Sequence, residues 1–132
     1  MKANELMIGD WVKFPIGNEK IIDLPYIPGK GICASFAASA TLFPVEVEKL
    51  QPIPLTAEIL EKNGLKPDTA EDAYKYCYRI ESVSIVECYA NAGGRYRAII
   101  SFGDTRLRIT LMFVHQLQHA LRLCEIEKEI KL

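Results

Sequence analysis

The sequence predicts an α+β protein, on three observations. Apolar and polar residues alternate in short runs over residues 11–50, they alternate again over residues 74–111, and apolar residues recur at helical spacing from residue 113. We expect a small β unit over residues 1–50. Over residues 51–132 we expect a short helix and an antiparallel β-meander packed by a C-terminal helix, the whole forming one continuous compact domain.

Composition excludes several classes of protein. Of the 132 residues, 49% are hydrophobic and 25% are charged, which is typical of a soluble globular chain and not of a disordered one. The formal net charge of −1 gives no overall attraction to nucleic acid or to an anionic membrane, so any basic site must be local. The longest stretch without a charged residue, residues 31–45, is shorter than the ~20 residues that a membrane-spanning helix needs.

Cysteine usage indicates a reducing compartment. The sequence contains no C-x-x-C pair, and its opening lacks the basic and apolar segments of a secretory leader. We therefore expect a cytoplasmic protein with four free thiols. The four are Cys33, Cys77, Cys88 and Cys124. No cofactor is expected.

The start of the chain carries the clearest local pattern. In the run Leu-x-Ile-Gly-Asp-x-Val at residues 6–12, the Gly–Asp pair forms a turn and the apolar residues after it alternate as in a strand. SH3-like small barrels often open in this way. Three strands are expected in this unit, at residues 11–14, 20–23 and 45–50. A turn is expected at Gly17–Asn18, and residues 32–43 fit either a buried strand or a helix.

A short helix is expected after the proline-rich connector that ends the first unit. Thr56 is a suitable N-cap, and Gly64 provides the left-handed exit at the other end. Ile59 and Leu60 are expected to be its buried residues.

Four strands are expected in the meander, at residues 74–80, 82–90, 95–102 and 105–111. The first of them also fits a short helix capped by Thr69. Gly103–Asp104 fits a two-residue type II′ turn, and that loop length sets the register of the last two strands. The register puts three apolar pairs on one face, Ile100 with Leu107, Ala98 with Ile109, and Tyr96 with Leu111.

The opposite face of the last two strands is predicted to carry Arg95, Arg97, Arg106 and Arg108. These guanidinium groups are a candidate binding site for phosphates or for an acidic partner, and a merely solvated sheet face is the alternative. The loop near residues 91–94 leaves two registers open for Glu87. We expect the register that places Glu87 among the arginines, because the other would bury an unpaired carboxylate.

A C-terminal helix is expected over residues 113–124. One apolar stripe packs it on the sheet, formed by Val114, Leu117, Leu121 and Cys124. A second stripe lies on the opposite side of the helical wheel, formed by Leu123, Ile126 and Ile130. Burying each of these three would contribute roughly 1.5–3 kcal/mol, so they must fold back on the N-terminal unit or meet a second chain. We expect a second chain, and hence a homodimer.

His115 and His119 lie one turn apart on this helix, at the spacing of the H-E-x-x-H zinc-protease motif. Gln116 stands where that motif has its general-base Glu, and an amide cannot accept a proton from metal-bound water. Because both histidines lie opposite the first apolar stripe, we expect an exposed polar helix face. A metal site, with Glu125 or a residue from elsewhere as third ligand, is the alternative.

Three segments share a recognisable pattern: Asn-Glu-Leu-x-Ile-Gly-Asp-Trp-Val at residues 4–12, Pro-Ile-Pro-Leu-Thr-x-Glu-Ile-Leu-x-Lys-Asn-Gly at residues 52–64, and Val-His-Gln-Leu-Gln at residues 114–118. In this order and spacing they resemble a group of short uncharacterised proteins from prophage-like and mobile elements of gut anaerobic bacteria. The resemblance implies a bacterial cytoplasmic accessory protein without a catalytic role. In that group Asn is more frequent at the position of His119, which weakens a metal role.

The leading functional hypothesis is a non-enzymatic interaction module. It would bind a protein or a nucleic acid through the four arginines or through the small β unit. The second hypothesis is a metal-binding protein or metal-dependent hydrolase that uses His115 and His119. The third is a structural subunit of a larger assembly, joined through the apolar residues that follow the C-terminal helix.

Overall fold

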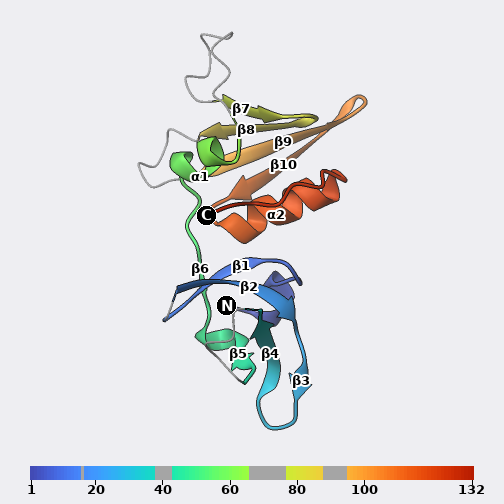
Figure 1. Ribbon diagram of the computed structural model, residues 1–132. Coiled ribbons are helices and arrows are strands. Elements are labelled where there is room, and N and C mark those ends of the chain that lie inside the picture. The colour runs from blue at the N-terminus through green and yellow to red at the C-terminus, as the bar shows by residue number, and fades with distance from the viewer. Residues whose placement is uncertain (16, 38–42, 66–76, 88–94) are drawn as a thin grey trace. The chain divides into compact units, whose positions relative to one another are not determined.

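The structure is a computed structural model, and it describes residues 1–15, 17–37, 43–65, 77–87 and 95–132 (Figure 1). The protein is α+β, with antiparallel strands and α-helices, as the sequence predicts. The chain divides into two compact units, Met1–Ile53 and Pro54–Leu132, which we call the first and the second unit. Each unit has its own sheet.

The first unit is, in its described part, an antiparallel sheet of six short strands in the order β3-β4-β2-β1-β6, with β5 beside β4. The strands are β1 (Trp11–Phe14), β2 (Gly17–Asp23), β3 (Tyr26–Ile27), β4 (Gly31–Phe36), β5 (Val45–Glu46) and β6 (Gln51–Pro52). Two short 3₁₀ helices accompany them, η1 (Ala3–Glu5) and η2 (Val47–Lys49). The expected small β unit is therefore present, while its finer SH3-like description stays an expectation.

The turn expected at Gly9–Asp10 is formed. The amide of Asp10 donates to the carbonyl of Met7 (3.2 Å), and Gly9 has a φ of 90°, which suits the third position of a type II turn. The Asp10 side chain is fully buried, and its Oδ2 accepts a hydrogen bond from the Met7 amide (2.8 Å). Ile21 in β2 exchanges backbone hydrogen bonds with Gly9 and Asp10, at 2.7 and 2.9 Å. The turn therefore joins the start of the chain to β2.

Replacing Asp10 by Ala is expected to lower the free energy of unfolding of the first unit by about 2 kcal/mol, because the Met7 amide loses a charge-assisted partner. Asp10→Asn keeps an oxygen acceptor and should lower it by less. Urea unfolding followed by the fluorescence of Trp11 measures both changes. A stability of Asp10→Ala equal to that of the wild type would contradict this role of the carboxylate.

Two expectations for the first unit are wrong in detail. Gly17 pairs with Phe14, so Gly17 and Asn18 already lie in β2 and the chain turns before them. Residues 45–50 form the short β5 followed by the 3₁₀ helix η2, not one strand. The physical reason is that Val47 and Leu50 are three residues apart and both buried, and a 3₁₀ turn brings such residues to one side. A strand would direct them to opposite faces.

The segment that fitted either a strand or a helix is β4 as far as Phe36. Residues 38–42 of that segment lie outside the described residues. The core of the first unit includes Val12, Ile21 and Phe36, and the ring of Phe36 stacks on that of Phe14 with centroids 6.3 Å apart. Sheet curvature thus brings strands β1 and β4 over a common apolar centre.

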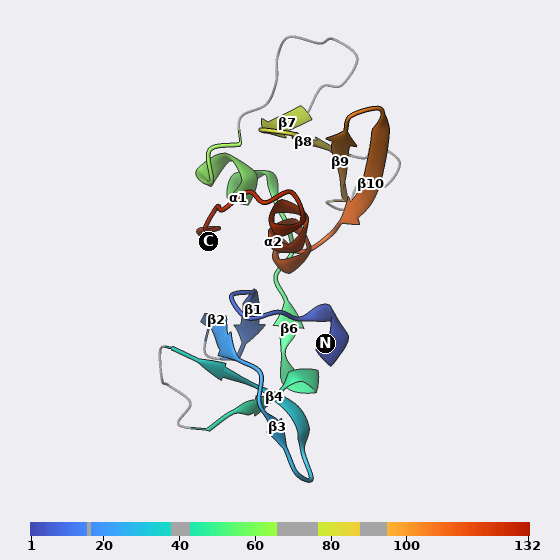
Figure 2. The same cartoon turned by 90° about the vertical axis from the view of Figure 1, so that its right-hand side faces the viewer.

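The second unit is an antiparallel meander in the order β10-β9-β8-β7 with helices on one side of it (Figure 2). Its elements are α1 (Ala57–Lys62), β7 (Cys77–Ile80), β8 (Val83–Glu87), β9 (Tyr96–Phe102), β10 (Thr105–Leu111) and α2 (Val114–Leu123). The expected meander and C-terminal helix are therefore confirmed. Parts of the expected first two strands, residues 74–76 and 88–90, lie outside the described residues, as does the helix cap expected at Thr69.

The two predicted ends of α1 are confirmed. The Oγ1 atom of Thr56 accepts a hydrogen bond from the Ile59 amide (3.3 Å), and Gly64 leaves the helix with a φ of 78°. Leu60 is fully buried as expected, whereas Ile59 is only half-buried.

The register set by Gly103–Asp104 is confirmed as well. Gly103, the second of the four residues of the turn, has the positive φ, 56°, that a type II′ turn needs at that position. Ile100, Ala98 and Tyr96 stand opposite Leu107, Ile109 and Leu111, in that order.

The register that we expected for Glu87 is wrong. In the structure Glu87 stands opposite Tyr96 and not among the arginines. The same register pairs Val83 with Ile100 and Ile85 with Ala98, and these four residues are fully buried. A shift by one residue would turn Val83 and Ile85 to the outer face and lose their apolar burial, so the burial of these two residues sets the register.

The chain after α2 folds back on the second unit instead of presenting an apolar stripe. Leu123 is 55% exposed, but Ile126 and Ile130 are 6% and 1% exposed. Asn63, buried at the end of α1, holds this segment, because its Nδ2 donates to the carbonyl of Lys131 and its Oδ1 accepts from the amide of Lys131, both at 2.7 Å. The reason for expecting a homodimer, an uncovered stripe, therefore no longer holds.

Candidate functional site

Arginines gather on the outer face of the second sheet. Arg106 and Arg108 belong to β10, Arg97 to β9 and Arg79 to β7, while Arg95 comes directly before β9. All five residues are exposed. The register places those on strands on the face opposite the buried row of Ala98 and Ile100. We call these five residues the arginine face.

Cross-strand pairing brings three members of this face close together. Arg97 pairs with Thr110, which makes it the diagonal neighbour of Arg108. Diagonal neighbours in an antiparallel sheet are about 7–8 Å apart, and Arg106 and Arg108, two residues apart on one strand, are about 7 Å apart. Arg79 lies in the same row as Arg108, three strands away, or about 14 Å.

The described strands place no acidic residue among these arginines. The other outer-face residues whose side chains the structure describes are small, hydroxyl-bearing or aliphatic: Ser84, Val86, Ile99, Ser101 and Thr110. Within the described ranges, Arg97, Arg106 and Arg108 form no ion pair with a carboxylate. A merely solvated face commonly mixes both signs of charge, whereas the outer row of the described strands β9 and β10 carries arginines and no acidic residue.

The chemistry of the arginine face is recognition of anions. Each guanidinium carries a permanent charge and a planar set of donors that grips a carboxylate or a phosphate with two parallel hydrogen bonds. It gives up no proton near neutral pH, so it supplies neither a general acid nor a general base. Every arginine of the sequence lies between residues 79 and 122. The basic residues of the first unit are all lysines.

Sequence reasoning found four of these five residues and missed Arg79. The reason is the turn between β7 and β8, formed by Glu81 and Ser82 between the paired residues Ile80 and Val83. Glu81 adopts a φ of 46° there, a conformation for which glycine or asparagine is the usual sequence signal. With that two-residue turn recognised, alternation alone would have placed Arg79 on the outer face.

His115 and His119 are brought together, but not on an exposed face. Their ring centroids are 5.7 Å apart, and the ring of His115 stacks on that of Phe113 at 5.8 Å. His115 is 4% exposed, so the expected exposed face is wrong; α2 is covered around more of its circumference than one stripe. Among the residues that the structure describes, no three His, Cys, Asp or Glu side chains lie close enough to share a metal ion.

Gln116 has a structural role at the start of α2. Its Oε1 accepts hydrogen bonds from the amides of Met112 (2.7 Å) and Phe113 (3.2 Å). Amides at the beginning of a helix have no partner within the helix, and a side chain three residues on commonly supplies one. The residue that occupies the general-base position of the zinc-protease motif therefore caps the helix.

The thiol of Cys124 is not activated. Burial raises the pKa of the Cys124 thiol, and a hydrogen bond with Ser82 lowers it in part. Cys124 is therefore held as the neutral thiol, which is a poor nucleophile. Cys33 is a free, buried thiol, while Cys88 lies outside the described residues.

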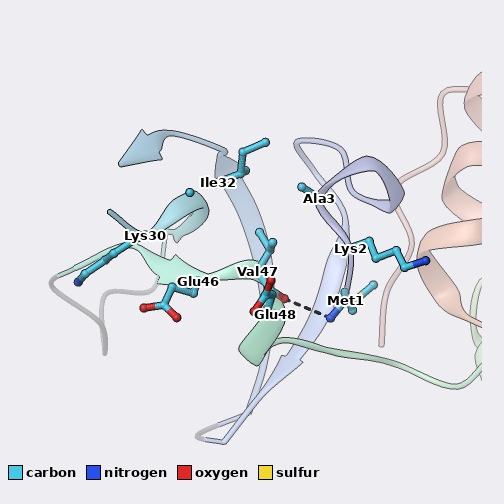
Figure 3. A pocket seen from close by; sticks show the side chains of 9 residues that line it. Met1, Lys2, Ala3, Lys30, Ile32, Glu46, Val47 and Glu48 are labelled. Carbon is cyan, nitrogen blue, oxygen red and sulfur yellow. Dashed lines mark hydrogen bonds between the residues drawn. The ribbon is translucent and has the colours of Figure 1, made fainter. Parts of the chain in front are cut away.

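The first unit contains a pocket of about 310 Å³ (Figure 3). Its charged lining residues are Lys2, Lys30, Glu46 and Glu48. Figure 3 shows the side chains of Lys2 and Lys30 extending in different directions, away from one another. Because these charges of both signs do not converge on one point, the pocket offers no defined binding chemistry comparable with that of the arginine face.

No protein-family model, curated protein or solved structure matches the chain. Kinship with proteins of bacterial mobile elements therefore stays an expectation. In the part of the chain that the structure describes, no helix has the length and apolar character needed to cross a membrane.

Proposed function

We propose that the protein is a non-enzymatic binding module and that its second unit takes up an anionic partner on the arginine face. The observation that carries this proposal is the clustering of Arg97, Arg106 and Arg108, exposed and without a described carboxylate partner, on one side of a rigid sheet. Sheet strands hold such groups in a constant geometry, and this favours specific recognition over diffuse attraction.

The use of arginine supports binding over mere solubility. Lysine would serve solubility equally well, and the protein uses it throughout the first unit. Arginine is the cation that recognises carboxylates and phosphates with two parallel hydrogen bonds. The local concentration of positive charge also stands against an overall net charge of −1, so the face is a patch and not part of a general basic character.

The cellular setting that we propose is the bacterial cytoplasm, in an accessory protein of a prophage-like or mobile element. The sequence resemblance described above and the absence of a cysteine-pair pattern support this setting. A metal-dependent function of His115 and His119 has less support, because His115 is buried against Phe113 and Gln116 serves as a helix cap.

The double substitution Arg97→Glu with Arg108→Glu tests the binding face. We expect it to weaken binding of a fluorescent heparin oligosaccharide, used as a generic anion, by about tenfold or more, since each lost charge-assisted contact is worth over ~1 kcal/mol. Both side chains are exposed, so the free energy of unfolding should change by less than ~1 kcal/mol. Anisotropy titration and urea unfolding measure the two quantities.

The matched control is Lys13→Glu with Lys30→Glu, which makes the same change of charge at exposed positions of the first unit. We expect this control to change heparin binding by less than about twofold at ~0.15 M salt, because it leaves the arginine face intact and salt screens charges that do not contact the ligand. If both double variants lose binding equally, the effect is one of net charge and the arginine face is not the site.

A further inference from the structure

We propose that β10 is the docking edge for an acidic peptide, which adds to the second sheet as an antiparallel strand beside β10. The inference rests on the proposed function and names the partner of that face. The partner is an extended segment in which carboxylate and aliphatic residues alternate.

β10 has the geometry of an open edge. It is the last strand of its sheet and, in the described part of the chain, pairs only with β9. Its seven residues run in continuous register with β9 and include no proline. Such an edge presents backbone N–H and C=O groups to the side away from its neighbour, where an extended peptide can pair. Residues 105–108 and Thr110 are exposed, and the edge is about 24 Å long.

The inner face of this edge is apolar and uncovered toward the β9–β10 turn. Leu107 is 40% exposed and Phe102, at the end of β9, is 49% exposed, whereas Leu111 at the other end of β10 is fully buried. Ile109, between them, is half-buried. Aliphatic side chains of an added strand would cover Leu107 and Ile109 and remove their exposed surface from water.

The outer face of the same edge is cationic. A strand paired with β10 directs successive side chains to opposite faces, so every second residue would lie on the outer face, two of them beside Arg106 and Arg108. Directly opposed side chains in an antiparallel pair have Cβ atoms about 4.5–5.5 Å apart. At that distance an arginine can form a bidentate ion pair with Glu or Asp of the added strand. A peptide that alternates acidic and aliphatic residues therefore satisfies both faces at once.

Two other occupants fit this edge less well. Single-stranded nucleic acid on a sheet is commonly held by aromatic side chains, but Tyr78 and Tyr96 are on the inner face and only 1% and 3% exposed. A second copy of β10, paired antiparallel with both apolar faces on the same side, would bring arginines of the two copies opposite one another. Like charges in that position repel, so Arg106 and Arg108 disfavour self-pairing and favour an acidic strand.

A set of synthetic peptides tests backbone pairing. The parent alternates Glu and Val over about nine residues, and the composition control groups all Glu at one end. We expect the parent to bind at least about tenfold more tightly in anisotropy titrations, because only alternation serves both faces. Two further probes carry N-methyl groups on alternate peptide nitrogens of the parent, one on the Glu nitrogens and the other on the Val nitrogens. In a paired strand only one of these two sets of N–H groups faces β10. We therefore expect one probe to bind like the parent and the other to lose binding.

Equal binding of the parent and the grouped peptide, or of the two N-methylated peptides, would overturn strand addition. On the protein, Leu107→Thr should weaken parent-peptide binding severalfold while leaving heparin binding unchanged. That variant keeps a strand-forming residue, and its position is already 40% exposed. Heparin or oligouridylate binding that depends on Arg97 and Arg108, without peptide binding, would overturn the peptide but not the proposed function. If anion binding did not depend on Arg97 and Arg108, the proposed function itself would be overturned.

Discussion

We expect the replacement of Ile130 by Ala to lower the free energy of unfolding of the second unit by about 2–5 kcal/mol. Ile130 is 1% exposed and among the largest fully buried side chains of the protein. Removing three carbon atoms from such a site costs the transfer free energy of those atoms and the energy of the cavity left behind. Urea unfolding followed by the near-ultraviolet circular dichroism of the Tyr78–Tyr96 ring pair measures the change.

Leu123→Ala is the matched control, because Leu123 has a side chain of the same size and is 55% exposed. We expect that variant to change stability by less than ~1 kcal/mol. If the two substitutions had equal small effects, the segment after α2 would not be docked, and Ile126 and Ile130 would again be available for a second chain.

Asn63→Ala is expected to destabilise the second unit by about 3 kcal/mol. The side chain, which is 5% exposed, makes two hydrogen bonds to the backbone of Lys131 and a third to the carbonyl of Ile59, all at 2.7 Å. A typical net contribution is about 1 kcal/mol for each bond, with a further cost where a buried group stays unpaired. Asn18→Ala, at an exposed position of β2, is the control and should be nearly neutral.

The double variant Asn63→Ala with Ile130→Ala separates two explanations. If both residues stabilise the unit by holding the same segment, their effects are less than additive, since a segment released once cannot be released again. Full additivity would mean that each residue acts on its own surroundings, and it would contradict the role of Asn63 as the clamp of the C-terminal segment.

Sequence patterns predicted the elements whose signals are local. Thr56 and Gly64 mark the two ends of α1, and the sequence predicted them because capping depends on residues within one turn of the helix. Gly103–Asp104 fixed the register of β9 and β10 for the same reason, since a two-residue turn leaves one pairing only. The four arginines predicted on one face followed from that register.

Other features depend on contacts that local patterns do not record. The register of β8 was set by the joint burial of Val83 and Ile85 and not by the single charge of Glu87. A helical wheel predicted His115 to be exposed because it counts one buried stripe, whereas α2 buries more than one. The local sequence around Asn63 indicated only a common helix terminus, because the residue that Asn63 binds, Lys131, lies 68 residues away in the chain.

The clamp between Asn63 and Lys131 has a consequence for synthesis on the ribosome. The first unit has all its strands once Pro52 has been made, so its sheet can close early. The second unit needs Ile130 and the backbone of Lys131 to complete its core, although α1 is made some seventy residues earlier. Until then its nascent chain exposes apolar surface, and it is this half of the protein that a ribosome-associated chaperone would meet.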